Sequence, residues 1–154
     1  SRAANEDPLT GLPNRRYFFE NVLKQTRPFG VAMVDIDHFK AINDQFGHDI
    51  GDLALKPLAD LLRAHFPGRH IARFGGEEFV ILLQAEREQD MQPALETFRE
   101  QVSQMVYPTA MGDLRFTLSV GVAAGQNDIS ALLKLADDRL YKAKQQGRNR
   151  VCVD

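Results

Sequence analysis

Apolar residues recur at helical spacing near the C-terminus of this chain. Between Asp128 and Gln146 the apolar side chains fall on one stripe of a helix: Ile129, Leu132, Leu133, Ala136, Leu140 and Ala143. Asp128 can accept hydrogen bonds from the first turn, and Gly147 can end the helix. The pattern therefore predicts an amphipathic helix over these residues.

A short apolar run from Phe29 to Ile36 is typical of a buried strand, and it leads directly into acidic residues. Weaker patterns complete the set of elements. They predict helices over 14–25 with Asn14 as its cap, 38–46, 52–64 (kinked at Pro57) and 90–105, and strands over 71–74, 79–83, 115–123 and 151–153. Strands and helices in this order predict a single α/β sandwich.

Composition narrows the class of protein. The chain has 154 residues, 44% of them apolar and 26% charged, which is ordinary for a globular domain. A net charge of −2 gives no support for binding nucleic acid polymers or acidic membranes. Cys152 is the one cysteine, which excludes an internal disulfide and is compatible with a reducing compartment. We expect a cytoplasmic domain over 7–154, with 1–6 as a residual linker from an upstream sensory or membrane-anchored region.

Two acidic clusters stand at the ends of predicted strands. Asp35, Ile36 and Asp37 end the first strand, and Glu77 and Glu78 occupy a predicted hairpin turn. Alternation along a strand places Asp35 and Asp37 on one face. If the hairpin pairs beside the first strand, both clusters meet at one sheet end, where carboxylates could hold Mg²⁺. The alternative is structural: the glutamates are solvated turn residues, and Asp35 caps the next helix.

Four ordered motifs favour the metal site. RFGGEEF at 73–79 resembles the signature of the GGDEF family, and three further segments match that family in order: DPLTGLPNR at 7–15, DIDHFK at 35–40 followed by IND at 42–44 and FGHDIGD at 46–52, and KQQGRN at 144–149. The resemblance covers the chain from Asp7 onward. It implies diguanylate cyclase activity, in which two GTP molecules are joined into cyclic di-GMP, and an antiparallel-rich sheet flanked by helices.

The resemblance also implies roles for individual residues. Asp35, Glu77 and the carbonyl of Ile36 would bind two Mg²⁺ ions, for which Mn²⁺ can substitute. Glu77 would also be the base for the ribose 3′-hydroxyl, with Glu78 a further acid beside the metals, and Lys40 a cation near the phosphates. Turnover would require a homodimer, because one site cannot close the ring; the isolated domain is compatible with a slow monomer.

The triphosphate end is assigned by the same resemblance to Lys144 and Arg148. Their chemistry agrees, because a triphosphate needs cations before another oxygen can approach its phosphorus. They stand four residues apart and would point the same way if the last helix continued through both. Otherwise they would be a solvated helix end that favours the macrodipole.

Asn43 and Asp52 match the guanine-reading positions of the family that the chain resembles, and His48 lies in the same segment as a further candidate contact. A carboxylate such as Asp52 can accept from both N1 and the 2-amino group of guanine, whereas adenine would leave it unpaired. The structural alternatives are a helix cap for Asp52, a surface turn for Asn43 and simple packing for His48. Leu55 could pack on the base or belong to the core.

The arginine-x-x-aspartate motif of the family's product-inhibition site is missing. The corresponding stretch at 66–69 reads FPGR, so we expect feedback inhibition at that site to be lost or much weakened. Three other functions stay open: a catalytically silent GTP-binding or interaction module, an enzyme that makes an adenine-containing cyclic dinucleotide, and a cyclase that closes a single nucleotide.

Overall fold

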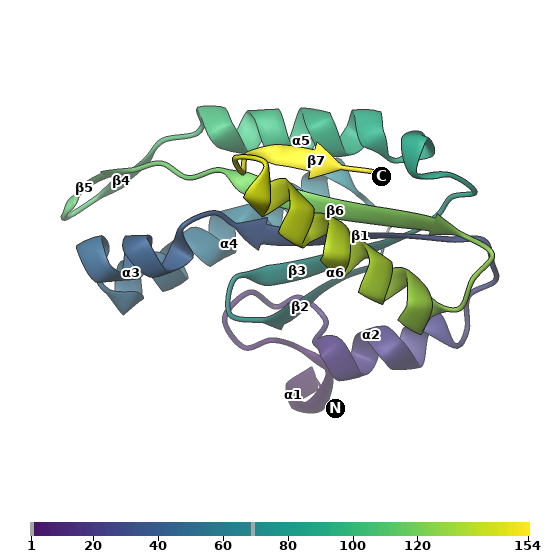
Figure 1. The fold of residues 1–154 in the computed structure, drawn as a ribbon. Helices are drawn as coiled ribbons and strands as arrows, with labels where there is room; N and C mark the ends of the chain where they lie inside the picture. Colours follow the sequence, from purple (N-terminus) through teal and green to yellow (C-terminus); the bar gives the residue numbers. More distant parts are fainter. Residues whose placement is uncertain (1, 69) are drawn as a thin grey trace.

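A computed structural model describes residues 2–68 and 70–154. Within them one central sheet has five strands in the order β2-β3-β1-β6-β7 (Figure 1): β1 (Phe29–Ile36), β2 (His70–Gly75), β3 (Glu78–Gln84), β6 (Leu118–Gly125) and β7 (Arg150–Cys152). All neighbours are antiparallel except β6 and β7, which are parallel. The expected α/β sandwich with a mostly antiparallel sheet is confirmed.

Helices cover both faces of this sheet. On one face lie α2 (Arg15–Val22) and α6 (Ile129–Gln145), which share a core with Phe29, Val31 and Met33 of β1. On the other face lie α4 (His48–His65) and α5 (Gln92–Gln104), which share a core with the alternate residues Ala32, Val34 and Ile36. Strand alternation thus divides β1 between two apolar layers, and all eight of its residues are buried.

The helix that the sequence pattern predicted most clearly is α6. Its N-cap Asp128 accepts from the amide of Ala131 at 2.9 Å. Gly121 of β6 allows the helix to lie close to the sheet, because a Cβ there would meet the carbonyl oxygen of Ala136 at 2.0 Å. The C-terminal end of α6 is thereby fixed above the end of β1, where the acids stand.

Several boundaries differ from the predictions. The helix α3 (Phe39–Phe46) ends at Gly47, whose φ of 90° separates it from α4, so α4 begins at His48 instead of residue 52. Pro57, which was predicted to kink the first turns of a helix over 52–64, lies instead in the middle of this 18-residue helix. β6 starts at Leu118, later than predicted, and α5 is preceded by a 3₁₀ turn, Glu88–Asp90.

Two short elements were not predicted. A hairpin of β4 (Tyr107–Thr109) and β5 (Gly112–Leu114) forms a separate two-stranded sheet at the end of the molecule where α3 also lies (Figure 1). Its strands are too short to show an alternating pattern. The helix α1 (Arg2–Asn5) falls within the predicted linker and is joined to Asn14, whose amide donates to the carbonyl of Asn5 at 2.9 Å.

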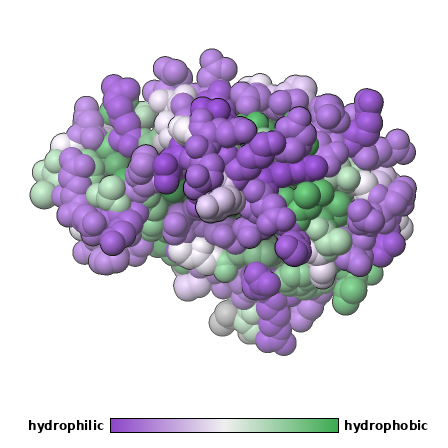
Figure 2. Space-filling view, viewed as in Figure 1, coloured by the Kyte–Doolittle hydropathy of each residue, from purple (hydrophilic) through white to green (hydrophobic). Residues whose placement is uncertain are grey.

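The surface agrees with the charged composition. The face seen in Figure 2 is mainly hydrophilic, with hydrophobic residues in separate areas. Among the residues that the structure describes, no helix combines the length and apolar character needed to cross a membrane.

Candidate active site

An open cleft of about 430 Å³ lies where β1 ends, between the start of α3, the β2–β3 turn and the last turn of α6. It brings together six of the predicted site residues: Asp35, Ile36, Lys40, Glu77, Lys144 and Arg148. Residues without a predicted site role complete its lining: Asp37, His38, Phe39, Ala41 and Asp44. The segments that carry these residues lie far apart in the sequence, so the fold itself assembles the cleft.

Pairing of β3 beside β1 produces the predicted convergence of acids. The Cα of Asp35 is opposite that of Glu78, and the amide of Ile36 donates to the carbonyl of Glu77 at 3.4 Å. Glu77 and Glu78 are both half-buried, which contradicts the solvated-turn alternative. Asp35 belongs to β1 and is not a helix cap, because His38 holds the cap position of α3.

Asp35 is a buried carboxylate whose two oxygens differ. Oδ2 accepts a hydrogen bond from Nζ of Lys144, while Oδ1 is buried without a hydrogen-bond partner among the described residues. Burial raises the pKa of Asp35; Lys144 opposes this rise, and the charges of Glu77 and Asp37 add to it. An unpartnered buried carboxylate oxygen costs free energy, and a cation in the cleft would remove that cost.

The two glutamates occupy different places. Glu77 lines the cleft, whereas Glu78 does not. Burial raises the pKa of Glu78, and so do the charges of Asp35 and Asp137, while Lys144 and Arg15 lower it. Glu78 therefore lies beside the cleft, toward α6 and α2, and its role at the metals stays a prediction.

The oxygen ligands in the cleft fit a Mg²⁺ ion whose remaining coordination positions are filled by a bound nucleotide. Among the described residues no three acidic, histidine or cysteine side chains are grouped to hold a metal ion. The cleft offers the carboxylates of Asp35 and Glu77 and the backbone at Ile36. Mg²⁺ commonly takes one or two protein carboxylates and fills its other positions with phosphate oxygens and water. These residues suit a divalent cation that arrives with a phosphate ligand.

The end of α6 differs from the prediction that one helix could continue through both Lys144 and Arg148. The helix does not continue to Arg148: Gly147 (φ 118°) ends it, with its amide bonded to Lys144 O at 3.4 Å and that of Arg148 to Ala143 O at 3.0 Å. This pair of bonds is the Schellman arrangement. Arg148 and Lys144 nevertheless line the same cleft. The solvated-end alternative is wrong for Lys144, which is bonded with Asp35.

Asp37 was noted in the sequence but was given no site role. It is 3% exposed and accepts from the hydroxyls of Thr117 and Ser119, each at 2.6 Å, and from the amide of Asn149 at 3.0 Å. It therefore joins β1, β6 and the turn after α6. In the sequence, only the place of Asp37 in the DID triplet could have indicated this structural role. Two of its three partners, Ser119 and Asn149, are more than 80 residues away.

The predicted guanine residues lie on α3 and α4, outside the lining of the cleft. Oδ1 of Asn43 is buried without a hydrogen-bond partner among the described residues, and a Cβ on Gly51 would meet it at 1.9 Å. Asn43 is thus a helical residue packed against α4, not a surface turn. Asp52 is exposed inside α4, so the helix-cap alternative is wrong.

Two other predicted contacts have contrasting surroundings. His48 is exposed at the start of α4. Leu55 is 0% exposed and belongs to the core, which agrees with the core alternative. Its contact with a base stays a prediction that would require the side chain to become exposed.

A half-buried ion pair fixes the β2–β3 turn that carries Glu77. Nη1 of Arg73 contacts Oδ1 of Asp7 at 2.9 Å, and its Nε and Nη2 donate to the carbonyl of Gly76 at 3.0 and 2.7 Å. Burial opposes ionisation of Asp7, but hydrogen bonds from Thr10 and Arg73 outweigh it and lower the pKa of Asp7. The opening segment therefore helps to shape the cleft from a distance.

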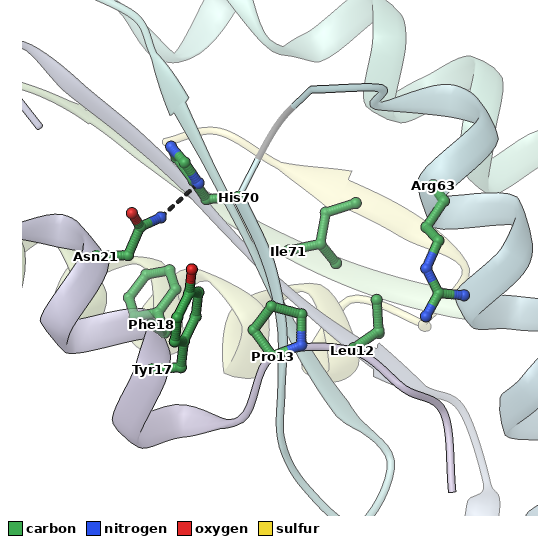
Figure 3. A pocket seen from close by; sticks show the side chains of 8 residues that line it. All are labelled: Leu12, Pro13, Tyr17, Phe18, Asn21, Arg63, His70 and Ile71. Carbon is green, nitrogen blue, oxygen red and sulfur yellow. Dashed lines mark hydrogen bonds between the residues drawn. The ribbon is translucent and has the colours of Figure 1, made fainter. Parts of the chain in front are cut away.

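A second pocket, of about 300 Å³, lies between α2, β2 and α4 (Figure 3). Asn21 and His70 are hydrogen-bonded at its wall at 2.5 Å, and Arg63 lies on the opposite side. None of the described residues that line this pocket is a carboxylate, unlike the cleft at the end of β1. In the nearby stretch 66–69, Phe66 is buried in the core, and Arg69 lies outside the described residues.

Comparison with known proteins agrees with this geometry. The family model "Diguanylate cyclase, GGDEF domain" matches residues 4–150. A diguanylate cyclase of Pseudomonas aeruginosa, DgcP, is 42% identical over 96% of this chain, and the response regulator PleD of Caulobacter vibrioides is 40% identical over 94%. The chain spans 23% and 35% of the lengths of these two relatives.

Solved structures show the same fold. The GGDEF domain of DgcB from Caulobacter crescentus, determined in complex with c-di-GMP, has a TM-score of 0.88 and 34% identity. The match covers 99% of this chain and 94% of that one. With a family model that covers nearly the whole sequence, the chain belongs to the GGDEF domain family, whose members form the catalytic domains of diguanylate cyclases.

Proposed function

We propose that this domain condenses two GTP molecules into cyclic di-GMP and two pyrophosphates. The observation that carries the proposal is the convergence of Asp35, Glu77 and Lys144 in one cleft, with Oδ1 of Asp35 buried and without a hydrogen-bond partner in the part of the chain that the structure describes. Diguanylate cyclases of this family generally depend on divalent metals. The cleft would hold two Mg²⁺ ions, or Mn²⁺ in their place, through Asp35, Glu77 and the carbonyl of Ile36.

The bound ions would neutralise triphosphate charge and stabilise the leaving oxygen. Lys40 and Arg148 would contact the phosphate oxygens from opposite sides of the cleft. Lys144 would turn from Asp35 to the phosphates once a cation has replaced it there. These contacts would lower the barrier by offsetting the negative charge that repels an incoming oxygen.

Glu77 would accept the proton of the ribose 3′-hydroxyl as that oxygen attacks the α-phosphorus of the second GTP. A phosphorus–oxygen bond forms, the bond to the β-phosphate breaks, and pyrophosphate leaves. The ring closes when the 3′-hydroxyl of the second nucleotide attacks the α-phosphorus of the first and the second pyrophosphate leaves. Each cleft would hold one GTP, so two domains must face each other, and the reacting species would be a homodimer.

Guanine would be selected on α3 and α4. Asn43 presents a buried oxygen that has no hydrogen-bond partner within 2–68 and 70–154, and Asp52 is an exposed carboxylate that could accept from N1 and the 2-amino group. His48 lies at the start of the same helix. Adenine has an acceptor at N1 and no 2-amino group, so it would leave Asp52 unpaired, which favours GTP over ATP.

Incubation with GTP, ATP or both, with and without Mg²⁺, followed by product mass, tests the proposal. We expect cyclic di-GMP from GTP alone, at a rate that rises more steeply than linearly with protein concentration. A mixed dinucleotide, a cyclic mononucleotide, or binding without product would each support one of the three other functions. Asp138→Asn, an exposed acid on α6, is the control for substitutions in the cleft.

A further inference from the structure

Two of the three aspartates that line the cleft have opposite surroundings. Asp35 has an oxygen with no hydrogen-bond partner among the described residues, whereas Asp37 accepts three hydrogen bonds. A carboxylate has about four acceptor positions, so Asp37 is nearly saturated by protein donors. It also takes part in no ion pair among the residues that the structure describes. Asp37 is thus bound as a structural acceptor, although it lines the cleft.

The most informative of these bonds leads to a strained turn. Arg148 and Asn149 are consecutive non-glycine residues with φ of 62° and 48°. The left-handed region is unfavourable for arginine and better tolerated by asparagine, so neighbouring contacts are needed above all to hold Arg148 there. The amide of Asn149 donates to Oδ2 of Asp37 at 3.0 Å, and Oδ1 of its side chain accepts from Nη1 of Arg99 at 2.6 Å.

Arg148 is held on both sides of its own backbone. Its amide is bonded to Ala143 O, its carbonyl accepts from Nε of Arg150 at 3.0 Å, and the next amide is bonded to Asp37. The first two bonds belong to the segment that follows α6. Asp37 supplies the bond from this segment to the sheet end that carries the acids, and so sets where Arg148 stands in the cleft.

We propose that Asp37 is a positioning residue for Arg148, acting through the amide of Asn149, and that it does not ligate a metal. The inference rests on the proposed function, because Arg148 would contact the triphosphate of GTP. It explains why Asp37 is nearly saturated by neutral donors while Asp35 keeps an oxygen that has no hydrogen-bond partner among the residues described.

The two roles predict different responses to the same change. In Asp37→Asn the amide oxygen can still accept from Asn149 and Thr117, and the new NH₂ group can donate to the hydroxyl of Ser119. Positioning therefore survives, whereas a metal ligand would lose its charge. In Asp37→Ala all three bonds are lost. The probe is 3′-deoxy-GTP with Mg²⁺, which lacks the attacking hydroxyl and therefore reports binding alone.

We expect Asp37→Asn to bind 3′-deoxy-GTP within about threefold of the wild type and Asp37→Ala to bind it about tenfold more weakly, the loss expected for a charged hydrogen bond. KM for GTP should rise in Asp37→Ala with a smaller change in kcat. In an Arg148→Ala background the effect of Asp37→Ala on binding should nearly vanish. Melting temperatures show whether each variant is folded.

Equal and severe losses in Asp37→Asn and Asp37→Ala would contradict the inference and indicate a metal ligand. Full additivity with Arg148→Ala would contradict it as well. If Asp37→Ala does not fold, Asp37→Asn still decides, with Asp35→Asn as the matched loss of a metal ligand. A wild-type chain that does not bind 3′-deoxy-GTP would instead remove the proposed function, and the inference with it.

Discussion

The two ends of the proposed substrate site, one for the triphosphate and one for the base, are built differently. The proposed phosphate end, at Asp35, Glu77 and Lys144, lies in an open cleft and carries a carboxylate whose pKa is raised by burial. The base end, on α3 and α4, has one buried oxygen in Asn43 and an exposed carboxylate in Asp52. Catalysis and base selection place different demands on the fold. Charge that develops on the triphosphate is stabilised best by preorganised groups shielded from water, whereas a planar base is selected by matched hydrogen bonds.

The largest effect should follow from Asp35→Asn. It keeps the shape of the side chain but removes the charge that would hold the metals, so turnover of GTP should fall by roughly 10³-fold or more. Cyclic di-GMP is measured by mass over time, with Asp138→Asn as the control that keeps activity. Near-normal turnover in Asp35→Asn would break the proposed difference between the two ends.

A smaller effect is expected at the base end. Asp52→Ala should weaken GTP binding about 10- to 100-fold, because a charged acceptor contributes roughly 1.5–3 kcal/mol, and ATP binding should change little. Competition between the two nucleotides measures the ratio. Asp49→Ala, an exposed acid in the first turn of the same helix, is the matched control. An equal loss for GTP and ATP would show that Asp52 does not read the base.

The ion pair that fixes the turn should affect stability more than chemistry. Asp7→Asn should lower the free energy of unfolding by about 1–2 kcal/mol, because it weakens a half-buried pair with Arg73. The folded pKa of Asp7 is lowered, so the stabilisation is fully present above the ordinary value of 3.8 and is lost as pH falls through the folded value.

Urea unfolding of wild type and Asp7→Asn as a function of pH measures this effect. The two proteins should differ near neutral pH and converge under acid conditions. A constant difference down to the lowest pH would mean that packing, and not charge, accounts for the loss.

Ionisation of Asp35 should have the opposite effect on stability from ionisation of Asp7: in the metal-free protein it should destabilise the fold. Burial raises the pKa of Asp35, so ionisation costs stability above the folded pKa, and this cost disappears as pH falls toward 3.8. Asp35→Asn should therefore be more stable than wild type near neutral pH without Mg²⁺, by on the order of 1 kcal/mol. Melting temperatures with and without Mg²⁺ and 3′-deoxy-GTP measure the gain, which should shrink or reverse when both are present.

The smallest expected effect is that of added product: cyclic di-GMP should leave turnover nearly unchanged. Because 66–69 lacks the arginine-x-x-aspartate motif, added cyclic di-GMP should not slow turnover at low concentrations. A progress curve that reaches a plateau and resumes when the product is removed, with product bound near Phe66, would show that inhibition survives by other contacts.

Local patterns predicted much of this molecule because the elements near the site follow simple rules. β1 matched its apolar run, and α6 began after the predicted N-cap Asp128. Three of the four motifs supplied the cleft residues, and each of these three spans a boundary where the chain leaves β1, β2 or α6. What sequence reasoning could not supply is the set of long-range partners: the bonds of Asp37 to Ser119 and Asn149 depend on strand order and on the turn after α6.

Boundaries failed where local and tertiary effects compete. The two helices were predicted separately, but the start of α4 was placed at residue 52, whereas α4 begins at His48 directly after Gly47 and so includes 48–51. The continuation of α6 to Arg148 was wrong because Gly147 reverses the chain, yet Arg148 still reaches the cleft. The spacing of Lys144 and Arg148 correctly placed both residues at one site, although the helical geometry assumed for that spacing was wrong.

The most direct test is a crystal structure with 3′-deoxy-GTP and Mn²⁺, whose anomalous signal locates the ions. The account predicts two Mn²⁺ sites at Asp35, Glu77 and the carbonyl of Ile36, the triphosphate beside Lys144 and Arg148, and guanine between Asn43 and Asp52. Nucleotide bound elsewhere, or a cleft that holds nucleotide with no metal at Asp35, would contradict it.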